Sequence, residues 1–147
     1  MAAPPKRKEE EELRRLSVEM RMLEQTAETL QQRISMLNAA MTDLTYASMT
    51  LEGVEKEKES TELLVPVGGG SYVKAKLSNP ETIIVGMGAG VSIEKPISEA
   101  RAILKGRLEE LGKSAVAAQQ QFGQIAERIN SGRNRLETLL SSVRERQ

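Results

Sequence analysis

A leucine repeat with a period of seven residues runs through the first third of the chain and restricts what it can fold into. Leucine occupies every seventh position from Leu16 to Leu51, and a second, mostly apolar set recurs three positions earlier. Apolar residues at alternating spacings of three and four are a strong coiled-coil signal, because they form one narrow seam along a helix. An ordinary amphipathic helix would be shorter and would carry a broader apolar stripe. We therefore predict a disordered N-terminus over residues 1–8 and a first coiled-coil helix over residues 9–61.

A second repeat of the same kind fills the C-terminal third. It becomes regular from Leu108 to Val143, and Pro96 is expected to open the helix, at a position that tolerates proline. We predict a second coiled-coil helix over residues 96–147. Two helices of similar length joined by a compact segment are expected to pair antiparallel within one chain, which places both termini at the same end. A parallel homodimer is the alternative.

Two details of the seams add to this prediction. Glu19 and Arg135 flank the two seams at equivalent positions, and we expect them to meet as an ion pair that selects the antiparallel orientation. Gly132 lies in the second seam, where it either lets the helices approach closely or leaves a gap. The same helix holds three other glycines, so a further hypothesis is an arm that bends and frays toward its end.

Residues 62–95 do not read as charged, periodic helix, and they have the pattern of two β-hairpins. Apolar runs such as LLVPV, VKAKL and TIIVGM alternate with the glycine clusters GGG and GAG, and SNPE joins the two halves. A pair of hairpins is marginal in water by itself and exposes unpaired strand edges. We therefore predict an oligomerisation head that needs other chains to complete its sheets. The residues expected to mediate subunit assembly are Leu63, Val65, Val67, Val73, Ala75, Leu77, Ile83, Ile84, Val85, Met87, Val91 and Ile93.

Composition narrows the chemistry that this chain can carry. Its 147 residues include 21 basic and 21 acidic side chains and no His, Cys or Trp. Without His or Cys there is no Ser-His-Asp triad, Cys-His pair or ordinary zinc site, so we expect no catalytic residues, no metal and no cofactor. Zero net charge gives no electrostatic reason to expect nucleic acid or an anionic membrane, and no apolar run is long enough for a membrane span. The first residues lack the apolar core of a signal peptide, which favours a cytoplasmic location.

Together these elements predict a mainly α fold with a small β head, a long antiparallel coiled-coil hairpin whose helices are joined by two β-hairpins. This layout, with LLVPVGGGSYVKAKL and TIIVGMGAGVSIEK between the helices, resembles the α-class subunit of prefoldin, particularly archaeal prefoldin. The resemblance covers essentially the whole chain, and two hairpins rather than one match the α rather than the β class. It implies a hexamer of two α and four β subunits whose hairpins form a double β-barrel. It also implies an ATP-independent molecular chaperone that captures unfolded protein clients at the coiled-coil tips and delivers them to a group II chaperonin.

Apolar residues near the outer ends of the helices are the candidates for client binding. Frayed terminal turns offer flexible apolar surface suited to promiscuous binding. The expected client-binding residues are Leu13, Leu16, Met20, Leu136, Leu139, Leu140 and Val143. Each also has a purely structural interpretation, that of closing the end of the coiled coil. Leu140 lies off the seam, so we expect it to be partly exposed whatever the register. The main alternative function is a coiled-coil structural scaffold or tether that binds no clients.

Overall fold

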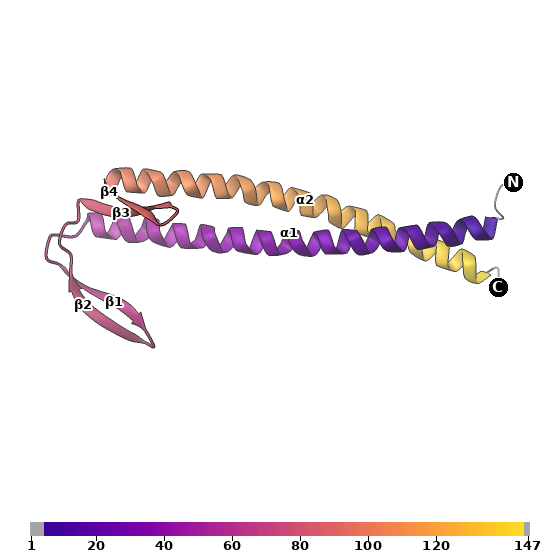
Figure 1. Ribbon diagram of the computed structural model, residues 1–147, viewed down its shortest axis with the longest axis horizontal. Helices are drawn as coiled ribbons and strands as arrows, with labels where there is room; N and C mark the ends of the chain where they lie inside the picture. Colours follow the sequence, from indigo (N-terminus) through magenta and orange to yellow (C-terminus); the bar gives the residue numbers. More distant parts are fainter. Residues whose placement is uncertain (1–4, 146–147) are drawn as a thin grey trace. The chain divides into compact units, whose positions relative to one another are not determined.

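The computed structural model describes residues 5–145 and contains two long helices separated by four strands (Figure 1). Helix α1 spans Pro5–Glu55 and helix α2 spans Ile97–Glu145. The strands are β1 (Glu62–Gly68), β2 (Ser71–Lys76), β3 (Thr82–Gly88) and β4 (Val91–Pro96). The predicted mainly α fold with a small β head is confirmed. The chain divides into a terminal unit, Met1–Asn38 with Lys113–Gln147, and a hairpin unit, Ala39–Gly112.

Helix α1 begins earlier than the sequence predicted. It starts at Pro5, in the first turn of the helix, where proline is tolerated because the first N–H groups have no partner within the helix. The disorder predicted over residues 1–8 therefore does not extend to residues 5–8, which are helical. Residues 1–4 lie outside the described part of the chain.

The same helix also ends earlier, at Glu55 rather than at residue 61. Just beyond it, the N–H of Lys56 donates to the carbonyl of Gly53 at 3.2 Å, a bond from residue i to residue i−3 that tightens the last turn. The charged residues that follow are exposed, and Ser60 takes a φ of 72°, which a right-handed helix does not allow. The sequence prediction overran because charged residues have good helix propensity and carry no stop signal.

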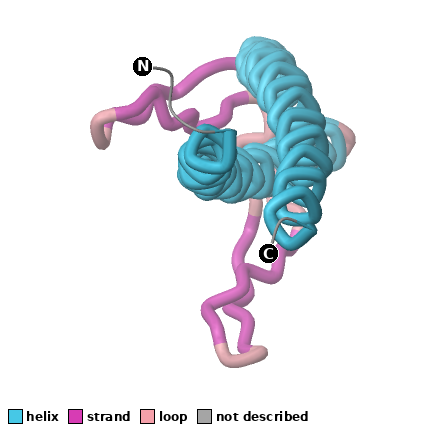
Figure 2. The backbone as a smooth tube through the Cα atoms, turned by 90° about the vertical axis from the view of Figure 1, so that its right-hand side faces the viewer, coloured by secondary structure: helices cyan, strands magenta, loops and turns pink. Residues whose placement is uncertain are grey.

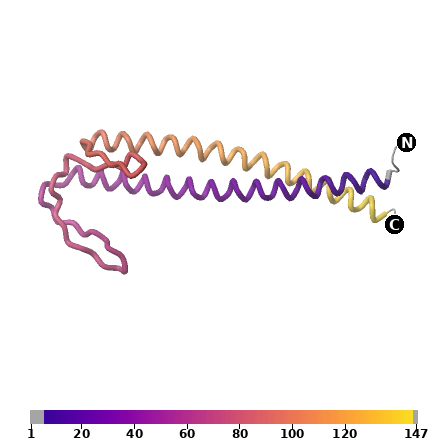
Figure 3. The backbone as a smooth tube through the Cα atoms, in the orientation of Figure 1, coloured from indigo at the N-terminus to yellow at the C-terminus, as the bar shows by residue number. Residues whose placement is uncertain are grey.

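Within the terminal unit the two helices run antiparallel. Glu19 pairs with Arg128, and Glu12, one heptad earlier on α1, pairs with Arg135, one heptad later on α2. The start of α1 in indigo and the end of α2 in yellow accordingly lie together in Figure 3. The antiparallel pairing predicted from the two repeats is thus present in a single chain.

The four strands form two separate antiparallel hairpins (Figure 2). Strand β1 pairs with β2 and β3 pairs with β4, and within residues 5–145 neither hairpin pairs with the other. Both turns have two residues with positive φ: 59° and 74° at Gly69 and Gly70, and 52° and 76° at Ala89 and Gly90. This is typical of type I′ turns, whose twist matches that of the flanking strands. The glycine clusters therefore close the hairpins, as predicted.

The hairpin β3–β4 packs on the two helices of the hairpin unit. Val85 of β3 is 5% exposed and forms a buried cluster with Leu51 of α1 and with Ile97 and Ala100 of α2. These apolar side chains are brought together from three elements that are distant in sequence. One face of this hairpin is thus covered by the chain itself.

Polar contacts fix the ends of β3–β4 on the start of α2. The guanidinium of Arg107 donates to the carbonyl of Gly86 at 2.6 Å, and the N–H of Ile97 donates to the carbonyl of Glu81 at 2.9 Å. Pro96, expected to open the helix, is instead the last residue of β4. Helix α2 therefore begins one residue later than predicted, at Ile97.

Candidate functional site

The seam of the terminal unit buries part of the predicted client-binding set. Met20 and Leu139 are 7% and 3% exposed. The half-buried members are Leu13, Leu16, Leu136 and Val143. Leu140 is 37% exposed, as its position off the seam predicted. The set therefore divides into two residues closed into the coiled coil, four at its margin and one that faces solvent.

Gly132 allows Met20 to fill the seam. A Cβ built on Gly132 would overlap the Met20 Sδ and would lie 3.4 Å from its Cε. Of the two interpretations that the sequence left open, close approach is therefore the one observed. Helix α2 is continuous on both sides of this glycine, and fraying of its end stays a prediction.

Ion pairs flank the same seam, and the partner predicted for Glu19 is wrong. Glu19 was expected to meet Arg135. Instead, Glu19 Oε1 lies 3.4 Å from Arg128 Nη2, and Glu12 Oε1 lies 2.9 Å from Arg135 Nη2. Arg128 and Arg135 are one heptad apart and occupy the same position of the repeat. The repeat alone therefore does not show which of them pairs with Glu19. A third pair joins Arg133 to Glu24 at 3.6 Å.

One face of the hairpin β1–β2 is apolar and open. The strand register places Leu63 opposite Ala75 and Val65 opposite Val73, so these four side chains share a face. Val65 and Val73 are both exposed. These four members of the predicted assembly set therefore form one apolar face, and its use in subunit assembly stays a prediction.

The other face of β1–β2 also carries apolar side chains that the sequence analysis missed. Leu64 and Tyr72 are exposed there, beside Lys74 and Lys76. Two lysines on one face are typical of a strand face exposed to solvent, so they obscure these apolar neighbours. The signal that could have revealed them is the unbroken run LLVPV, which leaves β1 apolar on both faces.

The hairpin β3–β4 uses its two faces differently. Val85 and Ile83 were predicted to contact other subunits, but they pack in the chain's own core, against the helices. On the opposite face Ile84 is 75% exposed. The remaining predicted assembly residues of this hairpin, Met87, Val91 and Ile93, are also exposed. Within the described residues, the chain itself therefore covers only one face of this hairpin.

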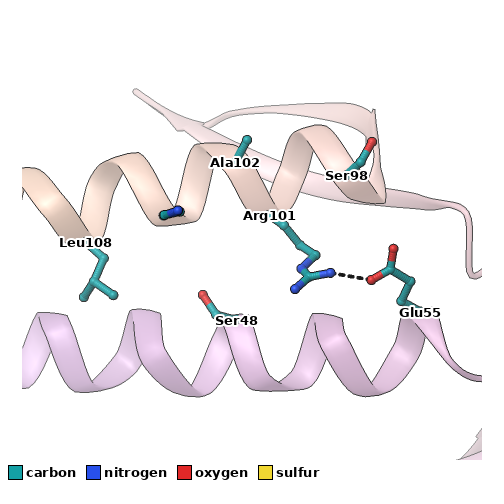
Figure 4. Close-up of a pocket in the computed structure, with 7 residues that line it drawn as sticks. Ser48, Glu55, Ser98, Arg101, Ala102 and Leu108 are labelled. Carbon is teal, nitrogen blue, oxygen red and sulfur yellow. Dashed lines mark hydrogen bonds and ion pairs between the residues drawn. The ribbon is translucent and has the colours of Figure 1, made fainter.

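A shallow hollow in the hairpin unit is lined in part by the ion pair of Arg101 and Glu55 (Figure 4). Arg101 Nη1 donates to Glu55 Oε2 at 2.5 Å. Glu55 is the single carboxylate among the residues that line this hollow. General acid–base catalysis by paired carboxylates needs two such groups, so the hollow offers no arrangement of that kind.

Two further kinds of site have no basis in residues 5–145. No group of three or more His, Cys, Asp or Glu side chains in this part of the chain is placed to hold a metal ion. No helix in it is long and apolar enough to cross a membrane. The candidate functional surfaces of the described residues are therefore the open hairpin faces and the margins of the terminal seam.

Comparison with known proteins places this architecture in a family. The family model described as "Prefoldin subunit" matches residues 23–142. The chain belongs to the prefoldin family. Prefoldin subunit alpha of Methanococcoides burtonii is 34% identical to it over 122 residues, which cover 83% of this chain and 88% of that protein. Prefoldin subunit alpha of Methanosarcina mazei is 32% identical over 136 residues, covering 90% and 93%.

A solved structure supports the same fold. A filamentous PFD from Methanocaldococcus jannaschii, determined by cryo-electron microscopy, superposes with a TM-score of 0.67 at 23% identity, covering 76% of this chain and 92% of that chain. The resemblance inferred from the heptad repeats and the two hairpins is confirmed. The chain is a prefoldin chaperone subunit, and prefoldins act as oligomers.

Proposed function

We propose that this chain is the α-class subunit of a cytoplasmic prefoldin hexamer of two α and four β subunits. In this proposal the complex captures unfolded protein clients without ATP and delivers them to a group II chaperonin. The similarity to archaeal prefoldin alpha subunits over most of the chain supports the assignment of class. The observation that carries the proposal is the pair of hairpins with open apolar faces.

Each hairpin is a two-stranded sheet whose outer edges have no strand partner in the described residues. Unpaired edges offer main-chain N–H and C=O groups to a strand from another chain. The exposed Val65 and Val73 on β1–β2, and Ile84 on β3–β4, supply apolar side chains for such a contact. A partner chain that added strands here would bury these side chains and satisfy the edges together.

Client capture is assigned to the ends of the coiled coil. The half-buried leucines at the margin of the seam and the exposed Leu140 form the apolar surface, while Met20 and Leu139 contribute only when the terminal turns open. Side chains at a frayed coiled-coil end adapt to many sequences, which suits a chaperone that binds many clients.

The test of assembly is a pair of aspartate substitutions on the open face, Val65→Asp with Val73→Asp. Charged side chains on an apolar interface cost enough to abolish a strand-mediated contact, so we expect loss of the complex with a β-class subunit in size-exclusion chromatography. The matched control is Val116→Asp on α2, an exposed valine of the terminal unit. If the hairpin variant still assembles, this face does not mediate subunit contacts.

The test of function is suppression of aggregation of a chemically denatured, unrelated protein by this chain, with and without a β-class partner. We expect suppression that requires both chains. A form of the chain truncated to residues 23–124 should still assemble but lose suppression. A stable complex that never suppresses aggregation would instead identify the chain as a scaffold or tether.

A further inference from the structure

In the terminal unit, the ion-paired acidic side chains and several basic side chains of α1 lie on different sides of the helix. The three carboxylates in the ion pairs described above all turn toward α2. Arg14, Arg15 and Arg21 alternate with them in the sequence, yet none of the three has an ion pair or hydrogen bond with another residue in the described part of the chain. All three are exposed. The outward side of α1 is therefore locally positive, although the chain has zero net charge.

These arginines surround two exposed apolar side chains. Val18 and Met22 are 53% and 63% exposed. Residues three and four apart are neighbours on a helix surface, so Val18 lies between Arg14 and Arg15 on one side and Arg21 and Met22 on the other. We name these five residues the outward basic face.

Acidic side chains are outnumbered by basic ones on this face. Glu11 lines a shallow hollow together with Arg14, Arg15 and Val18, and it is the single carboxylate there. Glu19 faces α2 and pairs with Arg128. Two further exposed acids lie on this side of α1, Glu10 four residues before Arg14 and Glu28 one heptad after Arg21. Exposed Arg7 and Lys8 lie one heptad before Arg14 and Arg15, so five basic against three acidic side chains leave an excess of positive charge beside apolar surface.

We propose that the outward basic face binds acidic, leucine-containing segments of unfolded polypeptide. This inference rests on the proposed client capture and specifies a preferred class of client. Guanidinium groups bind carboxylates through two parallel hydrogen bonds, and methionine adapts its shape to varied apolar partners. A segment that combines carboxylates with leucines complements both features of the face.

Nucleic acid is the other polyanion that a basic face attracts, and this face fits it less well. Binding of single strands depends on aromatic side chains on which bases stack, and none of the five residues is aromatic. The apolar surface consists instead of a valine and a methionine. Polypeptide is therefore the favoured partner.

The test measures binding of fluorescent peptides by anisotropy, with the full-length chain assembled with a β-class subunit. The probes are an acidic and a basic unstructured peptide of equal length and leucine content, an acidic peptide without leucine, and a thymidine oligonucleotide. We expect the wild-type complex to prefer the acidic leucine-containing peptide, and this preference to weaken as salt screens the charges.

Two variants separate the contributions of charge and apolar surface. Arg14→Gln with Arg15→Gln and Arg21→Gln should lower affinity for the acidic peptide about tenfold and leave the basic peptide unaffected. The control Lys56→Gln with Lys58→Gln and Lys113→Gln removes the same charge from exposed positions elsewhere and should change neither affinity.

Val18→Ser with Met22→Ser is the second variant. It should weaken binding of the acidic peptide that contains leucine but leave binding of the leucine-free peptide unchanged. Both sets of substituted residues are exposed, so circular dichroism should show an unchanged fold.

Each contrary result has a distinct meaning. Equal binding of the acidic peptide by wild type and the arginine variant overturns the proposal, while the proposed function stands if aggregation of an uncharged client is still suppressed. Arginine-dependent binding of the oligonucleotide alone also overturns it, in favour of nucleic acid. Absence of both peptide binding and suppression in the wild-type complex overturns the proposal and the proposed function together.

Discussion

The sulfur of Met20 on α1 occupies the space over Gly132 of α2 in which a β-carbon would otherwise lie. The seam of the terminal unit thus pairs a long flexible side chain with the smallest residue. This complementarity explains why a glycine, which costs a helix about 1 kcal/mol relative to alanine, is accommodated at a seam position.

We predict that Gly132→Ala stabilises the chain less than Gly123→Ala does. The added methyl overlaps the end of the Met20 side chain, which must move within the seam, and the cost of this repacking offsets part or all of the gain in helix propensity of about 1 kcal/mol. Thermal unfolding followed by circular dichroism measures the change.

Gly123→Ala is the control for this substitution, because no atom lies within 4 Å of a Cβ at that position. It should raise stability, by up to about 1 kcal/mol. The double variant Met20→Ala with Gly132→Ala should be more stable than the sum of the single changes predicts, since the overlap is gone. Additive effects would show that the two residues are not coupled.

Charge reversal tests the observed register of the ion pairs. Glu19→Lys and Arg128→Glu should each destabilise the chain by less than about 1 kcal/mol, because both groups are exposed, and combining them should restore stability. Glu19→Lys combined with Arg135→Glu should show no restoration. Recovery in the second combination only would support the register that the sequence suggested.

The two faces of β3 should respond differently to alanine. Val85→Ala removes two methyl groups from the buried cluster and should destabilise the isolated chain by about 2 kcal/mol in chemical denaturation. Ile84→Ala, on the exposed face, should have little effect on the isolated chain but should weaken its complex with a β-class subunit. A large loss of stability for Ile84→Ala would mean that this side chain is buried in the free chain.

Arg107 is expected to hold the hairpin β3–β4 on α2. Arg107→Met keeps an unbranched apolar stem, although a shorter one, and removes the donor to the Gly86 carbonyl, a bond worth about 1 kcal/mol. Amide hydrogen exchange in β3 and β4 should become faster. Lys105→Met, a nearby exposed position, should leave it unchanged, and equal exchange in both variants would exclude this role for Arg107.

Helices and strands that follow from periodic patterns could be predicted from the sequence. The leucine repeat predicted the long helix that contains Met20, and the apolar runs between glycine clusters predicted the two hairpins. These features follow from helix and strand periodicity, which each segment expresses by itself. The resemblance to prefoldin likewise rested on the order of such segments.

Features that depend on contacts between distant segments were not readable in this way. Whether Val85 faces another subunit or the chain's own Leu51 depends on how the hairpin packs, and an all-apolar strand fits both cases. The pairing of Glu19 with Arg128 depends on the register of the two helices. Two registers that differ by one heptad give the same heptad pattern, so the sequence does not choose between them. The outward basic face was not predicted because the net charge of the chain is zero. Net charge counts all charged side chains together and does not show which side of a helix carries them.

In the proposed assembly through the hairpins, the separation of the strands into two independent sheets would give the subunit two binding sites for neighbouring chains. A chain with a single open sheet terminates growth, whereas a chain with two can join neighbours on both sides. In a mixture of the two kinds, the supply of bivalent chains would set whether particles close at a small size or continue to elongate. The length of an assembly would then be governed by the relative synthesis of its subunits, with no dedicated measuring component.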